Sequence, residues 1–188
     1  MTARHMFGGD FPAVIEAARR REPWALERVY TTLSPAVAGL LRVKGAAEPD
    51  DLTSEVFVGV LRNLDAFDGD EASFRSWVFT IAYRRLTDER RRRLRRPPPE
   101  PLDDGREIAS PVDVEADVGR ALATDRVRRL CDRLAANQRD VLVLRLFGRL
   151  TVREVAQVLE TSPAAVKGLQ RRGYAALARM LDQEGATP

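Results

Sequence analysis

Helical periodicity runs through almost the whole chain and is interrupted once, by a proline-rich segment near the middle. Over residues 10–96 and again over 118–184, apolar residues recur every three or four positions, which is typical of amphipathic helices. No run alternates cleanly between apolar and polar residues as a strand does. Residues 97–117 are rich in Pro, Asp, Glu and Gly without a period, so we expect a flexible linker there. The sequence therefore predicts an all-α protein with two small helical domains, 10–96 and 118–184.

Composition excludes several classes of protein. The chain has one cysteine, Cys131, and one histidine, His5, which leaves no intrachain disulfide and no cysteine-based metal site. It also lacks a His/Asp/Ser or His/Cys set and a glycine loop that could cradle phosphate. We therefore expect no enzyme activity, no catalytic residue, no metal and no cofactor. No apolar run approaches the ~20 residues that span a membrane, and no signal peptide precedes Asp10, so we expect a cytoplasmic protein without membrane insertion.

Arginine is clustered although the net charge is small. The formal net charge is +3, from 31 basic and 28 acidic residues, yet arginines gather at 84–96 and again at 167–179. Such clusters are typical of surfaces that bind phosphate, although the solvated face of a helix produces the same pattern. The patterns of the segments that carry the arginines are needed to distinguish these two interpretations.

Start and stop signals divide the first block into helices. Asp50 or Asp51 is expected to cap one helix, and Ser73 the next. Pro35 is a candidate kink or break inside the longest early helix, and Gly45 is a typical stop. The expected helices are 11–21, 23–44, about 51–64 and about 74–94.

The second block carries a helix-turn-helix pattern. Thr151 followed by Glu154 forms a capping box at the start of one helix, and Ser162-Pro163 is typical of an N-cap and first helical residue. In a helix-turn-helix the second helix enters the major groove of DNA. The expected helices are about 121–134, 137–147, 151–160 and 162–181.

One face of the last helix suits DNA. At 100° per residue its apolar side, including Val166 and Leu169, turns inward. The opposite side combines small residues, which let a DNA backbone approach, with cations that can reach base edges or phosphates. A basic solvated helix in a bundle is the alternative. The predicted DNA-reading surface consists of Ser162, Ala164, Lys167, Gly168, Gln170, Arg171 and Arg172.

The helix expected near 51–64 presents a charged and polar face that includes one apolar residue. Val58 lies among these residues and suits contact with a protein partner, although a single exposed apolar side chain is also ordinary. We predict a partner-binding surface made of Asp51, Ser54, Glu55, Val58 and Arg62.

A turn-rich acidic loop, 65–72, leads into an aromatic helix that ends in arginines. The aromatic stripe that begins with Phe74 and Trp77 is more typical of a core than of a platform for stacked bases. The arginines that follow, Arg84, Arg85 and the run at 90–96, are candidates for phosphate contacts. Each phosphate neutralised is expected to steepen the salt dependence of binding by nearly one log unit per log unit of salt.

Together these motifs resemble those of the extracytoplasmic-function (ECF) sigma factors of bacterial RNA polymerase, in the sigma-70 family. Residues 51–57, DLTSEVF, resemble the family's DLxQEVF, and 73–82, SFRSWVFTIA, resemble its FRxWLxxIA. Asp88 with the arginines after it resembles the DxxRRR ending, and Val166-Lys167 resembles the TVK of the promoter-reading helix. The resemblance covers about 10–94 and 120–181. It implies a subunit that binds core RNA polymerase and directs promoter-specific transcription initiation.

The resemblance also implies a role for each domain. Domain 10–96 would be region 2-like, docking on the polymerase clamp helices through the partner-binding surface and melting the promoter minus-ten element. Its loop from about Phe67 to Ser73 would receive a flipped base, whose extrusion costs a few kcal/mol. Domain 118–184 would be region 4-like, contacting the polymerase flap and reading the minus-thirty-five duplex with the DNA-reading surface. The implied minus-ten residues are Phe67, Asp68, Gly69, Ser73, Arg75, Trp77, Arg84, Arg85, Arg91 and Arg92.

Further partners follow from the resemblance, and some residues depart from the family pattern. An anti-sigma factor is implied, with a monomer when the chain is free. The loop is unusually acidic, Arg84 stands where Asn is common, and Gly168 begins a departure from the usual "SR", so the promoter sequence stays open. A stand-alone helix-turn-helix regulator is an alternative function that the arginine-ended helix disfavours. An interaction protein that occupies polymerase without reading DNA is another.

Overall fold

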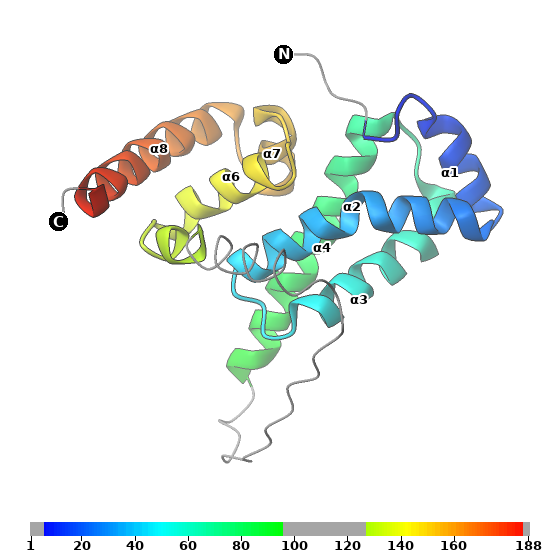
Figure 1. Ribbon diagram of the computed structural model, residues 1–188, viewed down its shortest axis with the longest axis horizontal. Helices are drawn as coiled ribbons and strands as arrows, with labels where there is room; N and C mark the ends of the chain where they lie inside the picture. Colours follow the sequence, from blue (N-terminus) through cyan, green and yellow to red (C-terminus); the bar gives the residue numbers. More distant parts are fainter. Residues whose placement is uncertain (1–5, 96–126, 186–188) are drawn as a thin grey trace.

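The computed structural model describes residues 6–95 and 127–185, and these residues form helices and turns without a strand. The predicted linker, 97–117, and the start of the predicted second domain lie outside the described residues. The helices, labelled as in Figure 1, are α1 (Phe11–Arg19), α2 (Pro23–Val43), α3 (Pro49–Arg62), the 3-10 turn η1 (Leu64–Ala66), α4 (Glu71–Arg95), α6 (Ala136–Leu146), α7 (Val152–Val158) and α8 (Pro163–Gly185). Residues 127–132 are also helical. The predicted all-α class is confirmed.

The first unit, α1 to α4, packs around α2. This helix contacts α1, α3 and α4, and buries the apolar side that its sequence presents, including Val29, Leu33 and Leu41. An aromatic cluster closes the end of the unit nearest α1. The ring of Phe74 lies 5.5 Å from that of Phe11 and 5.1 Å from that of Phe67. Because burial of each such side chain contributes about 1.5–3 kcal/mol, this cluster holds the loop before α4 against α1.

Pro35 neither breaks nor ends α2, contrary to one expectation. The helix runs unbroken from Pro23 to Val43 although Pro35 cannot donate the hydrogen bond of its turn. Leu33 and Val37, on either side of it, are fully buried, so packing holds the helix where its own hydrogen bonding is interrupted. The helix then ends as predicted, with Gly45 at φ 74° in the left-handed region.

Two predicted helix caps are wrong. Helix α3 begins at Pro49 after Glu48, so Asp50 and Asp51 lie in its first turn, where their charges favour the helix dipole. Helix α4 begins at Glu71, before the predicted cap Ser73. A carboxylate oxygen of Asp70 accepts a hydrogen bond from the Ser73 N–H at 2.8 Å. Hydrogen bonds from Ser73 hold the pKa of Asp70 below its usual range, so the charged carboxylate is the cap.

The second unit contains the predicted helix-turn-helix. Thr151 accepts a hydrogen bond from the Glu154 N–H at 3.3 Å, and the Glu154 side chain accepts one from the Thr151 N–H, which confirms the capping box. The hydroxyl of Ser162 accepts a hydrogen bond from the Ala165 N–H at 3.1 Å at the start of α8. Helix α6 supports α8 from behind: a Cβ at the buried Gly173 would lie 2.8 Å from Leu142, so glycine lets these helices approach closely.

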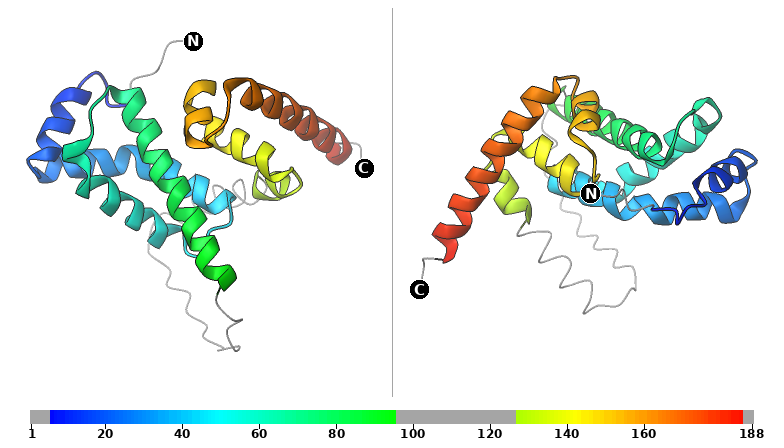
Figure 2. Two further views of the ribbon diagram at one scale, coloured as in Figure 1. Left: turned by 180° about the vertical axis from the view of Figure 1, so that it is seen from behind. Right: turned by 90° about the horizontal axis from the view of Figure 1, so that it is seen from above.

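The two units pack against each other, with α7 beside α4 and α6 beside α2 (Figures 1 and 2). Their buried apolar residues form one continuous cluster. A Cβ at the buried Gly39 on α2 would lie 2.6 Å from the Phe147 ring, so this contact requires glycine. None of the described helices is both long and apolar enough to cross a membrane.

Candidate nucleic-acid interface

The exposed side of α8 carries the predicted DNA-reading residues. Lys167, Arg171 and Arg172 are exposed, whereas Gly168 and Gln170 are half-buried at the edge of the same surface. The apolar side of the helix turns inward as predicted, with Val166 fully buried. Ser162 and Ala164 are exposed at the start of the helix. The structure therefore gathers all the predicted residues at the first three turns of one helix.

A hollow on this surface includes Tyr174, which was not among the predicted residues. It has a volume of about 480 Å³ and is lined by Val152, Lys167, Gln170, Arg171 and Tyr174. Tyr174 is 45% exposed and follows Lys167 by seven positions, which places both on one side of a helix. That spacing was the available signal, and it is weak because aromatic residues at helical spacing usually face a core.

The loop and α4 form an aromatic shelf, which we define as Phe67 and Trp77. Their rings stack with centroids 5.2 Å apart and an angle of 28° between their planes. A hollow of about 500 Å³ adjoins the shelf and is lined by Asn63, Ala66, Phe67, Asp68, Trp77 and Ile81. Phe67 itself is buried, and Trp77 is half-buried. The lining combines apolar side chains with the acidic residue Asp68, which suits a flat ring that carries hydrogen-bond donors.

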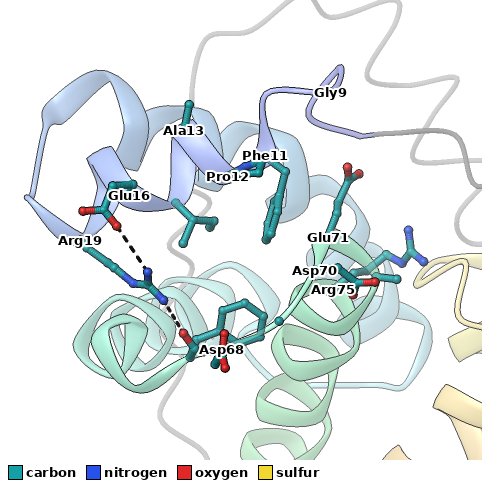
Figure 3. Close-up of a pocket in the computed structure, with 14 residues that line it drawn as sticks. Gly9, Phe11, Pro12, Ala13, Glu16, Arg19, Asp68, Asp70, Glu71 and Arg75 are labelled. Carbon is teal, nitrogen blue, oxygen red and sulfur yellow. Dashed lines mark hydrogen bonds and ion pairs between the residues drawn. The ribbon is translucent and has the colours of Figure 1, made fainter.

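A larger pocket, of about 810 Å³, lies on the other side of the loop, between the loop and α1 (Figure 3). Its walls include Phe11 and Phe67, and acidic side chains line it, among them Glu16 and Asp70. The guanidinium of Arg19 hydrogen-bonds to Glu16 at 3.4 Å and to the Phe67 carbonyl, so it is engaged in holding the loop. Because carboxylates repel phosphate, this pocket is not suited to the backbone of a nucleic acid.

The predicted minus-ten arginines divide into two groups. Arg84, Arg85, Arg91 and Arg92 are exposed along α4. Arg75 instead is 8% exposed, and its guanidinium lies 4.0 Å from Glu154 on α7. Its Nε has no hydrogen-bond partner among the described residues. In this arrangement Arg75 therefore contacts the second unit and is not open to DNA.

The loop residues complete the predicted minus-ten surface. Asp68, Gly69 and Ser73 are exposed. Gly69 has φ 151°, and a Cβ at this position would lie 2.9 Å from Ser73 and 3.2 Å from the Phe67 ring. A side chain at position 69 would therefore clash with Ser73 and with the Phe67 ring of the shelf.

The predicted partner-binding surface on α3 is exposed, and a residue of α2 lies beside it. All of its members on α3 are exposed, and Val58 is 47% exposed. Tyr30 of α2 is 42% exposed, and its ring packs 4.9 Å from that of Phe57. Beside it lies a hollow of about 380 Å³, which is lined in part by Arg42, Asp51 and Ser54. The position of Tyr30 beside α3 was not predicted, since the helical pattern of α2 alone does not say which of its exposed residues lie next to α3.

Metal binding receives no support from the described residues. Among them, no group of His, Cys, Asp and Glu side chains is arranged to hold a metal ion.

Comparison with protein families gives two matches, one in each unit. Residues 29–96 match the model of Sigma-70 region 2. Residues 124–177 match the model of Sigma-70, region 4. The first match contains α3, the shelf and α4, and the second contains the helix-turn-helix.

Individual proteins are similar over most of the chain. The ECF RNA polymerase sigma factor BldN of Streptomyces coelicolor is 34% identical over 91% of this chain, which spans 66% of the length of BldN. The ECF RNA polymerase sigma factor ShbA of Streptomyces griseus is 32% identical over 93% of this chain and 91% of its own length. Among solved structures, CnrH in complex with the cytosolic domain of CnrY has a similar fold, with a TM-score of 0.65 and 24% identity over 91% of this chain and 96% of CnrH.

Proposed function

The chain belongs to the extracytoplasmic-function sigma factors of the sigma-70 family. From this premise we propose which of its surfaces binds each promoter element and which binds the polymerase. It is a non-enzymatic subunit that binds RNA polymerase and directs promoter-specific transcription initiation. We assign residues 10–96 to the region 2-like domain and 118–184 to the region 4-like domain. The family matches over 29–96 and 124–177 support this division.

The DNA-reading surface of α8 binds the minus-thirty-five duplex in this proposal. Lys167, Gln170 and Arg171 line one hollow and reach base edges, where a bidentate contact discriminates between bases by about 1–3 kcal/mol. Ser162, Ala164 and Gly168 let the backbone approach, and Arg172 binds phosphate. Tyr174 extends the contact at the far end of the hollow.

The aromatic shelf binds the flipped base of the minus-ten element in this proposal. Flipping a base costs a few kcal/mol, and stacking on an aromatic ring returns about 1–3 kcal/mol per base. Trp77, backed by the buried ring of Phe67, supplies the stacking surface, and Asp68 accepts a hydrogen bond from the base. Gly69 and Ser73 shape the loop. The exposed arginines Arg84, Arg85, Arg91 and Arg92 bind phosphates of the separated strand, and Arg75 joins them only when α7 moves away.

Contacts with proteins complete the proposal. The surface made of Asp51, Ser54, Glu55, Val58 and Arg62 docks on the polymerase clamp helices, with Tyr30 at its edge, and the region 4-like domain contacts the flap. The free chain is a monomer and acts in the cytoplasm. An anti-sigma factor restrains it. This last assignment draws support from the family, and CnrH, whose fold is similar, was solved bound to another protein.

The observation that carries the proposal is one chain that joins an aromatic shelf and exposed arginines to a capped helix-turn-helix. The test is binding to purified core RNA polymerase, followed by run-off transcription on genomic fragments. Promoter-specific transcripts that disappear in Lys167→Ala/Arg171→Ala would support it. Specific binding to duplex DNA without any binding to core polymerase would instead indicate a stand-alone regulator. Unchanged transcription by the same double variant would indicate a protein that occupies polymerase without reading DNA.

A further inference from the structure

A buried ion pair joins the two units. Lys44, at the end of α2, is 4% exposed and contacts the carboxylate of Asp140 on α6. The hydroxyl of Tyr83 on α4 donates to the same carboxylate at 2.6 Å. The ammonium group of Lys44 also lies 5.6 Å from the centre of the Tyr83 ring. The carboxylate from the second unit is therefore held between a cation and a hydroxyl from the first, and we name Lys44, Tyr83 and Asp140 the latch.

Positive charge is concentrated around the latch. Burial lowers the pKa of Lys44 to about 8, and the nearby guanidiniums of Arg90 and Arg139 act in the same direction. Asp140 opposes them, because its carboxylate favours the charged ammonium. Arg139 is engaged within its own unit, where it contacts Asp132 at 3.1 Å. Loss of the Asp140 carboxylate would therefore leave a buried cation beside other cations, which strongly disfavours the packed arrangement.

The rest of the contact between the two units combines close apolar packing with a buried guanidinium, that of Arg75, whose hydrogen bonding is incomplete. The buried Phe79 of α4 faces Gly148, which follows α6, and Gly39 faces the Phe147 ring. Arg75 is buried under α7, with an unpaired Nε and its closest carboxylate at 4.0 Å. A buried guanidinium with incomplete hydrogen bonding is costly, so this part of the contact favours separation. The packed arrangement is therefore held by this apolar packing together with the latch.

In the packed arrangement the two units lie too close together to bind both promoter elements at once. The minus-ten and minus-thirty-five elements lie about 25 base pairs apart by name, which is on the order of 85 Å of duplex. In the structure the Arg84 guanidinium lies 3.7 Å from the Glu160 carboxylate, just before α8. Lys167 follows Glu160 by seven residues, so the backbones at Arg84 and Lys167 are at most about 40 Å apart even with extended chain and side chains. Both elements cannot be bound at once until the units separate.

We propose that the packed arrangement is a closed resting state of this sigma factor, held by the Lys44–Tyr83–Asp140 latch, and that its opening precedes promoter binding. The latch joins surfaces from both units, so a partner that binds them in separate positions must break it. Binding to core polymerase then includes the free energy of opening, and the apparent affinity falls by the fraction of molecules that are open. This inference rests on the proposed division of promoter elements between the units.

The first test measures closure directly. Donor and acceptor dyes are attached at Ala13→Cys on α1 and Arg153→Cys on α7, both exposed positions, in a Cys131→Ala background. Energy transfer in the free protein is then compared among latch variants. Asp140→Ala is expected to shift the closed-to-open ratio at least tenfold toward open. The matched control Asp132→Ala removes a carboxylate of the same unit that pairs with Arg139 and does not contact Lys44, and it should leave the transfer unchanged.

A compensating variant separates opening from misfolding. Replacement of a buried ion pair by apolar residues of similar size is often neutral or stabilising. Lys44→Met with Asp140→Leu should therefore restore the energy transfer that Asp140→Ala loses, while circular dichroism reports the helix content of every variant. Equal energy transfer in Asp140→Ala and Asp132→Ala would refute the claim that the latch holds the two units together. Failure of the double variant to regain transfer would also overturn it.

The second test connects closure to function, with unlabelled full-length chains and purified core RNA polymerase. Asp140→Ala is expected to bind core polymerase at least threefold more tightly than Asp132→Ala, because fewer molecules must open first. Equal affinity would overturn closure as a restraint. If the unchanged chain itself failed to bind core polymerase, the proposed function would fail while the energy-transfer result stood independently.

Discussion

Arg171 offers a sharp test of how α8 reads DNA. Its side chain is exposed in the hollow that also includes Lys167 and Gln170. Arg171→Ala should therefore change the free energy of unfolding by less than about 0.5 kcal/mol, as is usual for exposed positions. Binding of the polymerase holoenzyme to its promoter should lose about 1–3 kcal/mol, since a bidentate contact to a base edge is lost. This corresponds to roughly 5-fold to 150-fold in affinity.

The assay compares promoter affinity, measured by competition on a fragment recovered by run-off transcription, between Arg171→Ala and Arg179→Ala. Arg179 is also exposed on α8, and it lies eight residues on, about 12 Å further along the helix. The two variants lose the same charge, so a difference between them reports position. Arg171→Ala should also relax the preference at one base pair, whereas loss of a phosphate contact weakens all sequences equally and lowers the salt slope by about one. Equal affinities for the two variants would refute the assignment of Arg171 to a base edge.

Three further predictions concern other surfaces. Val58→Asp with Glu55→Arg should weaken binding to core polymerase without loss of helix content by circular dichroism, and unchanged binding would contradict the docking assignment. Asp70→Ala should lower the melting temperature at pH 7 by removing the cap of α4, a change typically of about 1 kcal/mol. Because the folded-state pKa of Asp70 is lowered, its contribution is present above the unfolded pKa and is lost as pH falls; a melting difference that persists after the carboxyl group is protonated would exclude the cap as its cause. Tyr174→Ala should reduce promoter affinity more than Tyr174→Phe, measured in the same competition assay, and equal effects of the two would show that the ring makes no contact.

Local signals in the sequence predicted much of the second unit. Thr151 and Glu154 formed the expected capping box, and Ser162 capped α8, because such motifs are complete within a few residues. The same reasoning was wrong at the start of α4, where Asp70 and Ser73 both suit a cap. Which of the two residues caps α4 depends on how the aromatic cluster holds the preceding loop. That packing involves residues far apart in the sequence, so it cannot be read from the local pattern.

The contact between the units could not be predicted from the sequence. Lys44 and Asp140 are 96 positions apart and carry no motif, and lysine and aspartate are usually exposed. Pro35 shows the same limit within one helix, since the packing of Leu33 and Val37 overrides a residue that usually ends helices. The resemblance implied that Arg75 is a minus-ten residue, and its position in the sequence does not show that Glu154 of α7 lies against it.

Run-off transcription measures whether this chain determines which promoters RNA polymerase uses. Purified core polymerase is mixed with the chain and a library of genomic fragments, and the transcript ends are mapped. We expect transcripts that need the chain, share sequence elements upstream of their start sites, and are lost with Lys167→Ala/Arg171→Ala. Transcripts that are the same with and without the chain would contradict it.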